Sequence, residues 1–230
     1  MAIILAIETS TKSCSVCISK NGKSVALSEI NGNYSHAENI ALFTQNVLTK
    51  AKLSVNDVDA VAVSSGPGSY TGLRIGLSFA KGLCYSLSIP LISIDTLEAL
   101  SYSEKVNTLA KNTHDLPVLL CPMIDARRME VYAAIFTANY QRIRETNADI
   151  IESSSYLQFL EKHKMLFFGD GAAKCKPILT HQHAIFIDDV VASSMNMCAL
   201  AEKKFNDSLF EDTAYFEPNY LKEFQTGIRK

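Results

Sequence analysis

The sequence has no long apolar run. No apolar stretch approaches the roughly 18 residues that a membrane-spanning helix needs. The apolar run that begins at Met1 stops at Glu8 and has no basic region before it, so it predicts a first strand rather than a signal peptide. We therefore expect no membrane association and a cytoplasmic location.

The sequence also lacks an excess of basic residues. It carries 22 Lys and Arg against 24 Asp and Glu, a formal net charge of −2. Proteins that bind nucleic acid on their own usually carry a basic surplus. Arg127-Arg128 and Arg229-Lys230 are the only adjacent basic pairs that include arginine, and we interpret each as a solvated edge rather than an RNA clamp.

The six cysteines lack the spacing of a metal site or a disulfide framework. Cys14 and Cys17 form a C-x-x-C, but they lie in a predicted strand, where positions three apart point to opposite faces. The other four cysteines are isolated in the sequence. We expect reduced, mostly buried thiols.

A glycine-rich stretch from Asp59 to Gly76 is the most informative segment present. Residues 60–63 predict a buried strand, and Gly66, Pro67 and Gly68 predict a tight turn. A helix is predicted from about residue 72 to about residue 88, shortly before Pro90. A strand, a glycine turn and a helix N-terminus together can receive an anion on free backbone N–H groups.

Three interpretations of this stretch compete. A phosphate-binding loop requires a lysine after the last glycine, and the sequence has none there. A dinucleotide fingerprint requires G-x-G-x-x-G, whereas Gly66, Gly68 and Gly72 follow G-x-G-x-x-x-G, although Asp95 could imitate the ribose-binding acid. The third interpretation is close packing of helix and strand, which also explains a stripe of small residues spaced four apart: Gly72, Gly76, Ala80 and Cys84.

The order of predicted elements repeats. The first half predicts strands at 2–8, 13–19 and 23–30, a helix at 35–52, the glycine strand and helix, a strand at 91–94 and a helix at 96–106. The second half predicts strands at 117–124, 130–136 and 141–151, a helix to about 162, a strand at 165–168, a short helical piece, a strand at 184–187 and a helix to about 205.

Both halves therefore contain a β-β-β-α-β-α unit, and the polar stretch 107–115 predicts a boundary between domains 1–106 and 107–230. This duplicated plan is similar to that of the actin-like ATPase and sugar-kinase superfamily, an α/β fold with a mixed sheet flanked by helices in each domain. In that plan the turn after each first strand holds phosphates, and here the first such turn is Glu8 to Lys12.

Three motifs resemble the TsaB family. They are Ile7-Glu-Thr-Ser10, the stretch from Ser64 to Gly76, and Met123-Ile-Asp-Ala-Arg127 followed by Glu130-Val-Tyr132. The first two are shared with the catalytic paralogue TsaD, whereas the third and the Tyr-Thr-Gly-Leu-Arg version of the second point to TsaB. The likeness is dense up to about residue 135 and thin afterwards, although Pro218-Asn-Tyr-Leu221 resembles the tail of the family.

The resemblance implies a scaffold without chemistry of its own. Such a subunit pairs with TsaD, and with the ATPase TsaE nearby, for threonylcarbamoyl transfer to the adenosine beside the anticodon of tRNA. Contact with tRNA would then be indirect, and alone the subunit would form a homodimer. The alternative is a catalytically active ATPase or kinase of the same fold.

The resemblance also implies that a catalytic metal is absent. TsaD carries His-His-x-Glu-x-His, whose histidines hold a metal, and the matching run here puts Asp95, Thr96 and Leu100 at the histidine positions. The remaining histidines do not rebuild a site: His36 is predicted in a surface or capping role, and the other four have no ligand set near them in sequence. We expect no catalytic residue, no metal and no cofactor.

Two surfaces are predicted. Superfamily kinases have an aspartate and a glycine in the first turn and this chain does not, so we expect at most a weak vestigial anion site at Glu8, Thr9, Ser10, Ser65, Gly66, Pro67 and Gly68. The helices at 35–52 and 72–88 carry apolar residues on more than one face, which predicts a four-helix contact with a paralogue. The predicted contact residues are Ile40, Leu42, Phe43, Val47, Leu73, Gly76, Leu77, Phe79, Ala80 and Leu83; we expect Leu77→Asp or Phe43→Asp to weaken pairing and leave the fold intact.

Overall fold

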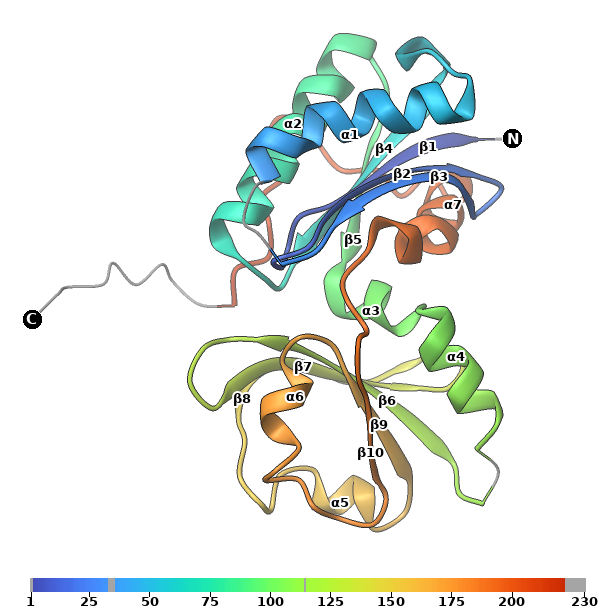
Figure 1. Ribbon diagram of the computed structural model, residues 1–230. Coiled ribbons are helices and arrows are strands. Elements are labelled where there is room, and N and C mark those ends of the chain that lie inside the picture. The colour runs from blue at the N-terminus through green and yellow to red at the C-terminus, as the bar shows by residue number, and fades with distance from the viewer. Residues whose placement is uncertain (1, 33–35, 114, 222–230) are drawn as a thin grey trace, which may run out of the picture.

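The computed structural model describes residues 2–32, 36–113 and 115–221, which form two lobes, each built on a five-stranded mixed sheet (Figure 1). The spatial order is β3-β2-β1-β4-β5 in the first sheet and β8-β7-β6-β9-β10 in the second, so the duplicated α/β fold is confirmed. In each sheet the first three strands pair antiparallel and the last two join in parallel. The strands are β1 (Ile3–Glu8), β2 (Cys14–Lys20), β3 (Lys23–Ile30), β4 (Ala60–Gly66), β5 (Leu91–Asp95), β6 (Val118–Asp125), β7 (Glu130–Thr137), β8 (Arg142–Ile150), β9 (Lys164–Phe168) and β10 (Ala184–Ile187).

Helices cover both faces of the first sheet. The helices α1 (His36–Ala51) and α2 (Tyr70–Leu87) lie on one face, and α7 (Cys198–Asn206), which follows the 3₁₀ turn η2 (Ser194–Met197), lies on the other (Figure 1). The strands β1, β4 and β5 are rich in apolar residues because both of their faces are buried, whereas β3 at the other edge is partly exposed. The predicted helix at 35–52 is confirmed as α1, although residue 35 lies outside the described residues.

The second sheet is covered in the same way. The short helices α5 (Leu157–Leu160) and α6 (Ala172–Cys175) pack on one face, and α3 (Thr96–Ser101) and α4 (Glu104–Lys111) pack on the other. Helix α3 contributes to both lobes, because Leu97 and Leu100 join the core of the second lobe while Ala99 joins that of the first. The first of the two chain connections between the lobes is therefore a buried helix.

Three element boundaries differ from the sequence prediction. The single helix predicted at 96–106 is broken after Ser101, which lets α4 turn onto the second sheet through Val106. Residues 107–111 of the polar stretch 107–115 are consequently the second half of α4. The helix predicted to about residue 162 is reduced to the four residues of α5.

The C-terminal part of the chain returns to the first lobe. Met197, Cys198 and Leu200 pack with Ile4 and Ala62 of the first sheet, so the second lobe does not extend over all of residues 107–230 as predicted. Beyond α7, residues 211–220 run along the outer edge of β5 and the flank of α2. We call this segment the C-terminal strap.

Candidate functional site

The turn after β1 is buried beneath the start of α2. Glu8, Thr9 and Ser10 are fully buried. A Cβ atom added to Gly68 or Gly72 would clash with the backbone oxygen of Ser10 or Thr9, respectively. The third glycine of this row, Gly76, packs against the Thr9 side chain, whose Oγ1 donates to the Gly72 carbonyl at 2.8 Å. This geometry supports the close-packing interpretation of the glycine stretch.

The backbone amides that an anion would need already donate within the chain. The Ser10 amide donates to Glu8 Oε1 at 2.6 Å, and the Thr9 amide donates to Ser64 Oγ at 3.3 Å. At the entry to α2 the Ser69 amide donates to the Ser10 carbonyl at 2.6 Å, and Ser69 Oγ caps the helix by accepting from the Gly72 amide at 3.2 Å. In this arrangement these four N–H groups are occupied.

Glu8 is the buried ionisable group of the turn, whereas Lys12 at its end is exposed. Its Oε1 accepts from the Ser10 amide, whereas its Oε2 is buried without a hydrogen-bond partner among the described residues. Burial raises the pKa of Glu8 above its ordinary value, and the hydrogen bonds from Ser10 and Ser64 offset part of that rise. Ser10 Oγ is likewise buried and lacks a partner in the described chain. The described hydrogen bonds join Glu8 to Ser10 and Ser64 and to no second acid.

The C-terminal strap closes the outer side of the glycine loop. The Asn219 amide donates to the Ser65 carbonyl at 2.7 Å, and a Cβ on Gly66, whose φ is +104°, would lie 2.8 Å from the Asn219 oxygen. Tyr220 packs on Tyr70 with ring centroids 4.7 Å apart, and its hydroxyl accepts from Arg74 Nε at 3.1 Å. The chain's own tail thus covers Ser65 and Gly66 of the predicted anion site, and local sequence patterns did not indicate this contact.

The three residues at the positions that match the metal-binding histidines of TsaD have structural roles. Asp95 caps α3 by accepting from the Glu98 amide at 2.8 Å, and its other carboxylate oxygen lies 3.1 Å from Arg142 Nη2. Thr96 is fully buried, and Leu100 is part of the second-lobe core. Across the described residues, no group of three or more His, Cys, Asp or Glu side chains is arranged to hold a metal ion.

The histidines and cysteines are mostly packed into the fold. His36 is buried rather than on the surface as predicted, and its ring lies against Gly72. His183 Nδ1 lies 2.8 Å from the Leu160 carbonyl, while His114 lies outside the described residues. All six cysteines are buried and free, and Cys17 Sγ lies 3.5 Å from Cys198 Sγ.

Comparison with known proteins decides the family. The family model described as "TsaD: tRNA N6-adenosine threonylcarbamoyltransferase" matches residues 32–226. A protein of Haemophilus influenzae named "tRNA threonylcarbamoyladenosine biosynthesis protein TsaB" is 34% identical over 129 residues, which is 56% of this chain and 51% of that protein. The protein of the same name from Bacillus subtilis is 28% identical over 193 residues, 83% of this chain and 77% of that protein. The chain belongs to the TsaB family.

A solved structure with this fold accompanies the match. "YeaZ from Pseudomonas aeruginosa" superposes with a TM-score of 0.80 at 21% sequence identity, covering 96% of this chain and 100% of that one. That likeness establishes the fold. The match spans about half the length of the Haemophilus TsaB protein. No helix in the described part of the chain is both long and apolar enough to cross a membrane.

The predicted contact residues of this TsaB family member divide into two groups. Ile40, Val47, Leu73, Gly76, Leu77 and Ala80 are buried in the chain's own first lobe, so their side chains are not available to a partner. Leu42 is 50% exposed, and Phe43, Phe79 and Leu83 are half-buried. The expectation for Leu77→Asp is corrected accordingly: Leu77 is only 6% exposed, so an aspartate there would disrupt the core.

The outward face of α1 and α2 nevertheless carries exposed apolar groups. Tyr85, on the last turns of α2, is 86% exposed, and Leu42 lies on the neighbouring helix α1. The two helices pack against each other on the same face of the first sheet (Figure 1). We call the exposed side of this pair the α1–α2 face.

Proposed function

We propose that this chain is a non-catalytic partner subunit of a TsaD-type transferase in tRNA threonylcarbamoyladenosine biosynthesis. The names of its relatives and its match to the TsaD family model support this role. In this proposal the catalytic subunit supplies the chemistry, an ATPase of the TsaE type joins the pair, and tRNA is reached through the complex. In the absence of its partner the chain pairs with itself.

The observation that carries the proposal is which residues stand at the positions of the TsaD metal-binding histidines. Leu100 cannot ligate a metal and fills the core, while Asp95 is committed to a helix cap and an ion pair. Restoring a three-imidazole site at these positions would require dismantling both the cap and the core. The fold therefore retains a catalytic architecture whose metal positions now stabilise the structure.

The α1–α2 face is the surface that we assign to the catalytic partner. A paralogue with the same fold presents an equivalent pair of helices, and two such pairs can form a four-helix bundle. Stable contacts of this kind bury about 800 Å² on each partner. Leu42 and Tyr85 are the exposed anchors on this side, and they extend the contact beyond the half-buried residues.

The test is co-elution of the purified chain with a TsaD-type subunit in size-exclusion chromatography. Leu42→Asp should weaken pairing by about tenfold or more, because it places a charge in a desolvated contact. Val25→Asp is the matched control, since Val25 is also 50% exposed but lies on the edge strand β3. Equal co-elution of both variants with the wild type would reject this surface.

The alternative function, an autonomous ATPase or kinase, is tested on the isolated chain. In the proposal the isolated chain does not turn over ATP, because Glu8 has no partner acid and the loop amides are already used. ATP hydrolysis that persists through purification and is lost in Glu8→Gln would favour the alternative.

A further inference from the structure

The turn between β6 and β7 holds two consecutive arginines in an unusual backbone conformation. Arg127 has a φ of +70° and Arg128 a φ of +45°, and both are exposed. The left-handed region is costly for residues with a Cβ atom, and glycine or asparagine normally occupies it. Strained residues of this kind persist only where the surrounding structure holds them, and they cluster at functional sites.

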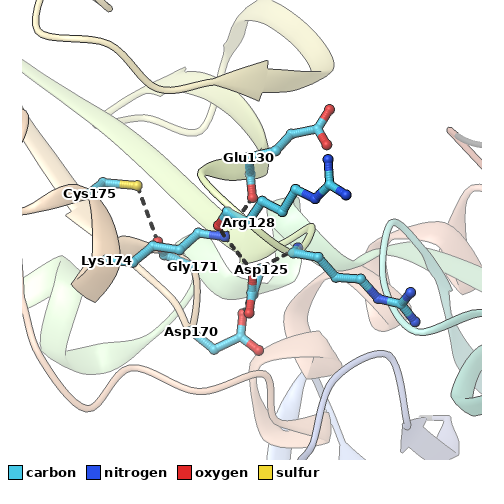
Figure 2. Close-up of polar contacts among 8 residues, drawn as sticks. Asp125, Arg128, Glu130, Asp170, Gly171, Lys174 and Cys175 are labelled. Atoms are coloured by element: carbon cyan, nitrogen blue, oxygen red, sulfur yellow. Dashed lines mark hydrogen bonds and ion pairs between the residues drawn. The ribbon is translucent and has the colours of Figure 1, made fainter. Parts of the chain in front are cut away.

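The side chain of Lys174, in α6, binds the backbone of this turn. Its Nζ donates to the Arg128 carbonyl at 2.8 Å and the Glu130 carbonyl at 2.7 Å, and it forms an ion pair with Asp125 (Figure 2). Asp125 Oδ1 also accepts from the Arg127 amide at 2.9 Å. The negative charge nearest the turn is thus paired with Lys174.

The two guanidinium groups face outward. In Figure 2 the Arg128 side chain runs away from Lys174. None of the ion pairs formed among the described residues includes Arg127 or Arg128. The turn that Lys174 holds thus presents two exposed cations without an ion-pair partner among the described residues.

Apolar side chains lie next to these cations. Met129 follows them directly and is 37% exposed, and Ile150, at the end of the edge strand β8, is 70% exposed. The two are close because the Ile151 amide donates to the Met129 carbonyl at 3.0 Å. Arginine and methionine are both enriched in protein interfaces, and exposed apolar groups beside them are typical of a contact centre. We call Arg127, Arg128, Met129 and Ile150 the arginine–apolar patch.

We propose that the arginine–apolar patch docks an acidic protein segment that carries an apolar side chain beside its carboxylates. Carboxylates match the planar guanidinium fork, and the apolar side chain would cover Met129 and Ile150. A protein is favoured over RNA because Met129 and Ile150 place exposed apolar surface beside the arginines, which an apolar side chain would cover and a phosphate backbone would not. The patch lies in the second lobe, so it is separate from the α1–α2 face and goes beyond the proposed function.

The test is fluorescence anisotropy with the full chain and labelled peptides. The probes are a peptide of alternating glutamate and leucine, a peptide of alternating glutamate and serine, and a single-stranded RNA of matched charge. The variant Arg127→Glu with Arg128→Glu should weaken binding of the glutamate–leucine peptide by about tenfold or more, because charge-assisted pairs are lost and their sign is reversed. Lys111→Glu with Lys162→Glu is the control, since it makes the same charge change at exposed positions elsewhere in the chain.

A second variant tests the clamp itself. Lys174→Met keeps both arginines but removes the three bonds that fix the turn, so it should weaken binding while circular dichroism shows an intact fold. The serine peptide should bind less tightly than the leucine peptide. The proposal is overturned if the acidic peptides fail to bind, if the control weakens binding as much as the arginine variant, or if RNA binds more tightly through the same two arginines.

Discussion

Gly72 and Gly82 lie ten residues apart in α2 and have opposite surroundings. Gly72 faces the Thr9 carbonyl, where a Cβ atom has no room, whereas a Cβ on Gly82 meets nothing within 4 Å. The same substitution should therefore have opposite effects at the two positions. Gly72→Ala should lower the free energy of unfolding by about 3 kcal/mol through overpacking, and Gly82→Ala should raise it by up to about 1 kcal/mol through helix propensity and a less flexible unfolded chain.

Urea unfolding of the two variants beside the wild type measures this difference. Each variant is the control for the other, because both replace a glycine with alanine in the same helix. If the Gly72→Ala protein were as stable as the Gly82→Ala protein, the turn at Thr9 would not pack closely against α2 in solution.

Glu8 predicts a pH dependence of stability. Because burial raises its pKa in the folded state, the folded protein binds the proton more tightly than the unfolded chain does. The contribution of Glu8 to stability is then fully present below its ordinary pKa of 4.5 and is lost as pH rises through the folded pKa. Glu8→Gln keeps an acceptor for the Ser10 amide but cannot ionise, so the variant should gain stability relative to the wild type as pH rises from about 4.5 to 8.

Chemical unfolding of both proteins at several pH values within that window tests this expectation. The exposed residue Glu161, changed to Gln, provides the control for loss of one carboxylate. A stability difference between Glu8→Gln and the wild type that stays constant with pH would contradict the raised pKa.

At the scale of elements, the C-terminal strap acts as a cover for the start of α2. Tyr220→Ala removes the ring contact with Tyr70 and the hydrogen bond from Arg74, whereas Tyr220→Phe removes only the hydrogen bond. An aromatic pair contributes about 1 kcal/mol beyond its buried area, so the alanine variant should exchange the amide hydrogens of the first turn of α2 about fivefold faster. Hydrogen-exchange mass spectrometry measures this, with the phenylalanine variant expected to lie between the alanine variant and the wild type. Unchanged protection in Tyr220→Ala would show that the strap does not hold that turn.

Elements with strong local signals could be predicted, and those set by distant contacts could not. The strand β3 follows from the dipeptide Asn21-Gly22, a typical hairpin signal whose left-handed backbone makes the turn. The break after Ser101 could not be predicted, because it depends on Leu97 and Leu100 packing on a sheet formed later in the chain. The contacts of Lys174 with Arg128 and of Asn219 with Ser65 join residues that are far apart in sequence. Such pairs leave no periodic pattern from which they could be predicted.

At the scale of the whole molecule, the lobes are joined by more than the chain connection through α3. Tyr102 packs with the first-lobe core and Tyr140 with the second-lobe core, and their rings stack with centroids 4.0 Å apart. The ion pair between Arg142 and Asp95, 3.1 Å apart and partly exposed, lies at the same junction. Pairs of this exposure contribute little on their own, so we expect the stacked tyrosines to contribute more to joining the lobes than this ion pair does.

Tyr140→Ala should therefore loosen the arrangement of the two lobes without unfolding either sheet. The stack and the hydrogen bond from the Tyr140 hydroxyl to Asn107, 2.6 Å long, are both lost, whereas Tyr140→Phe loses only the hydrogen bond. Small-angle scattering should show a larger radius of gyration for the alanine variant and a wild-type curve for the phenylalanine variant, with circular dichroism unchanged in both. If the α1–α2 face alone binds the catalytic partner, Tyr140→Ala should still co-elute with it, since both helices belong to the first lobe. A scattering curve for Tyr140→Ala that superimposes on the wild-type curve would mean that the stacked tyrosines are not needed to hold the lobes together.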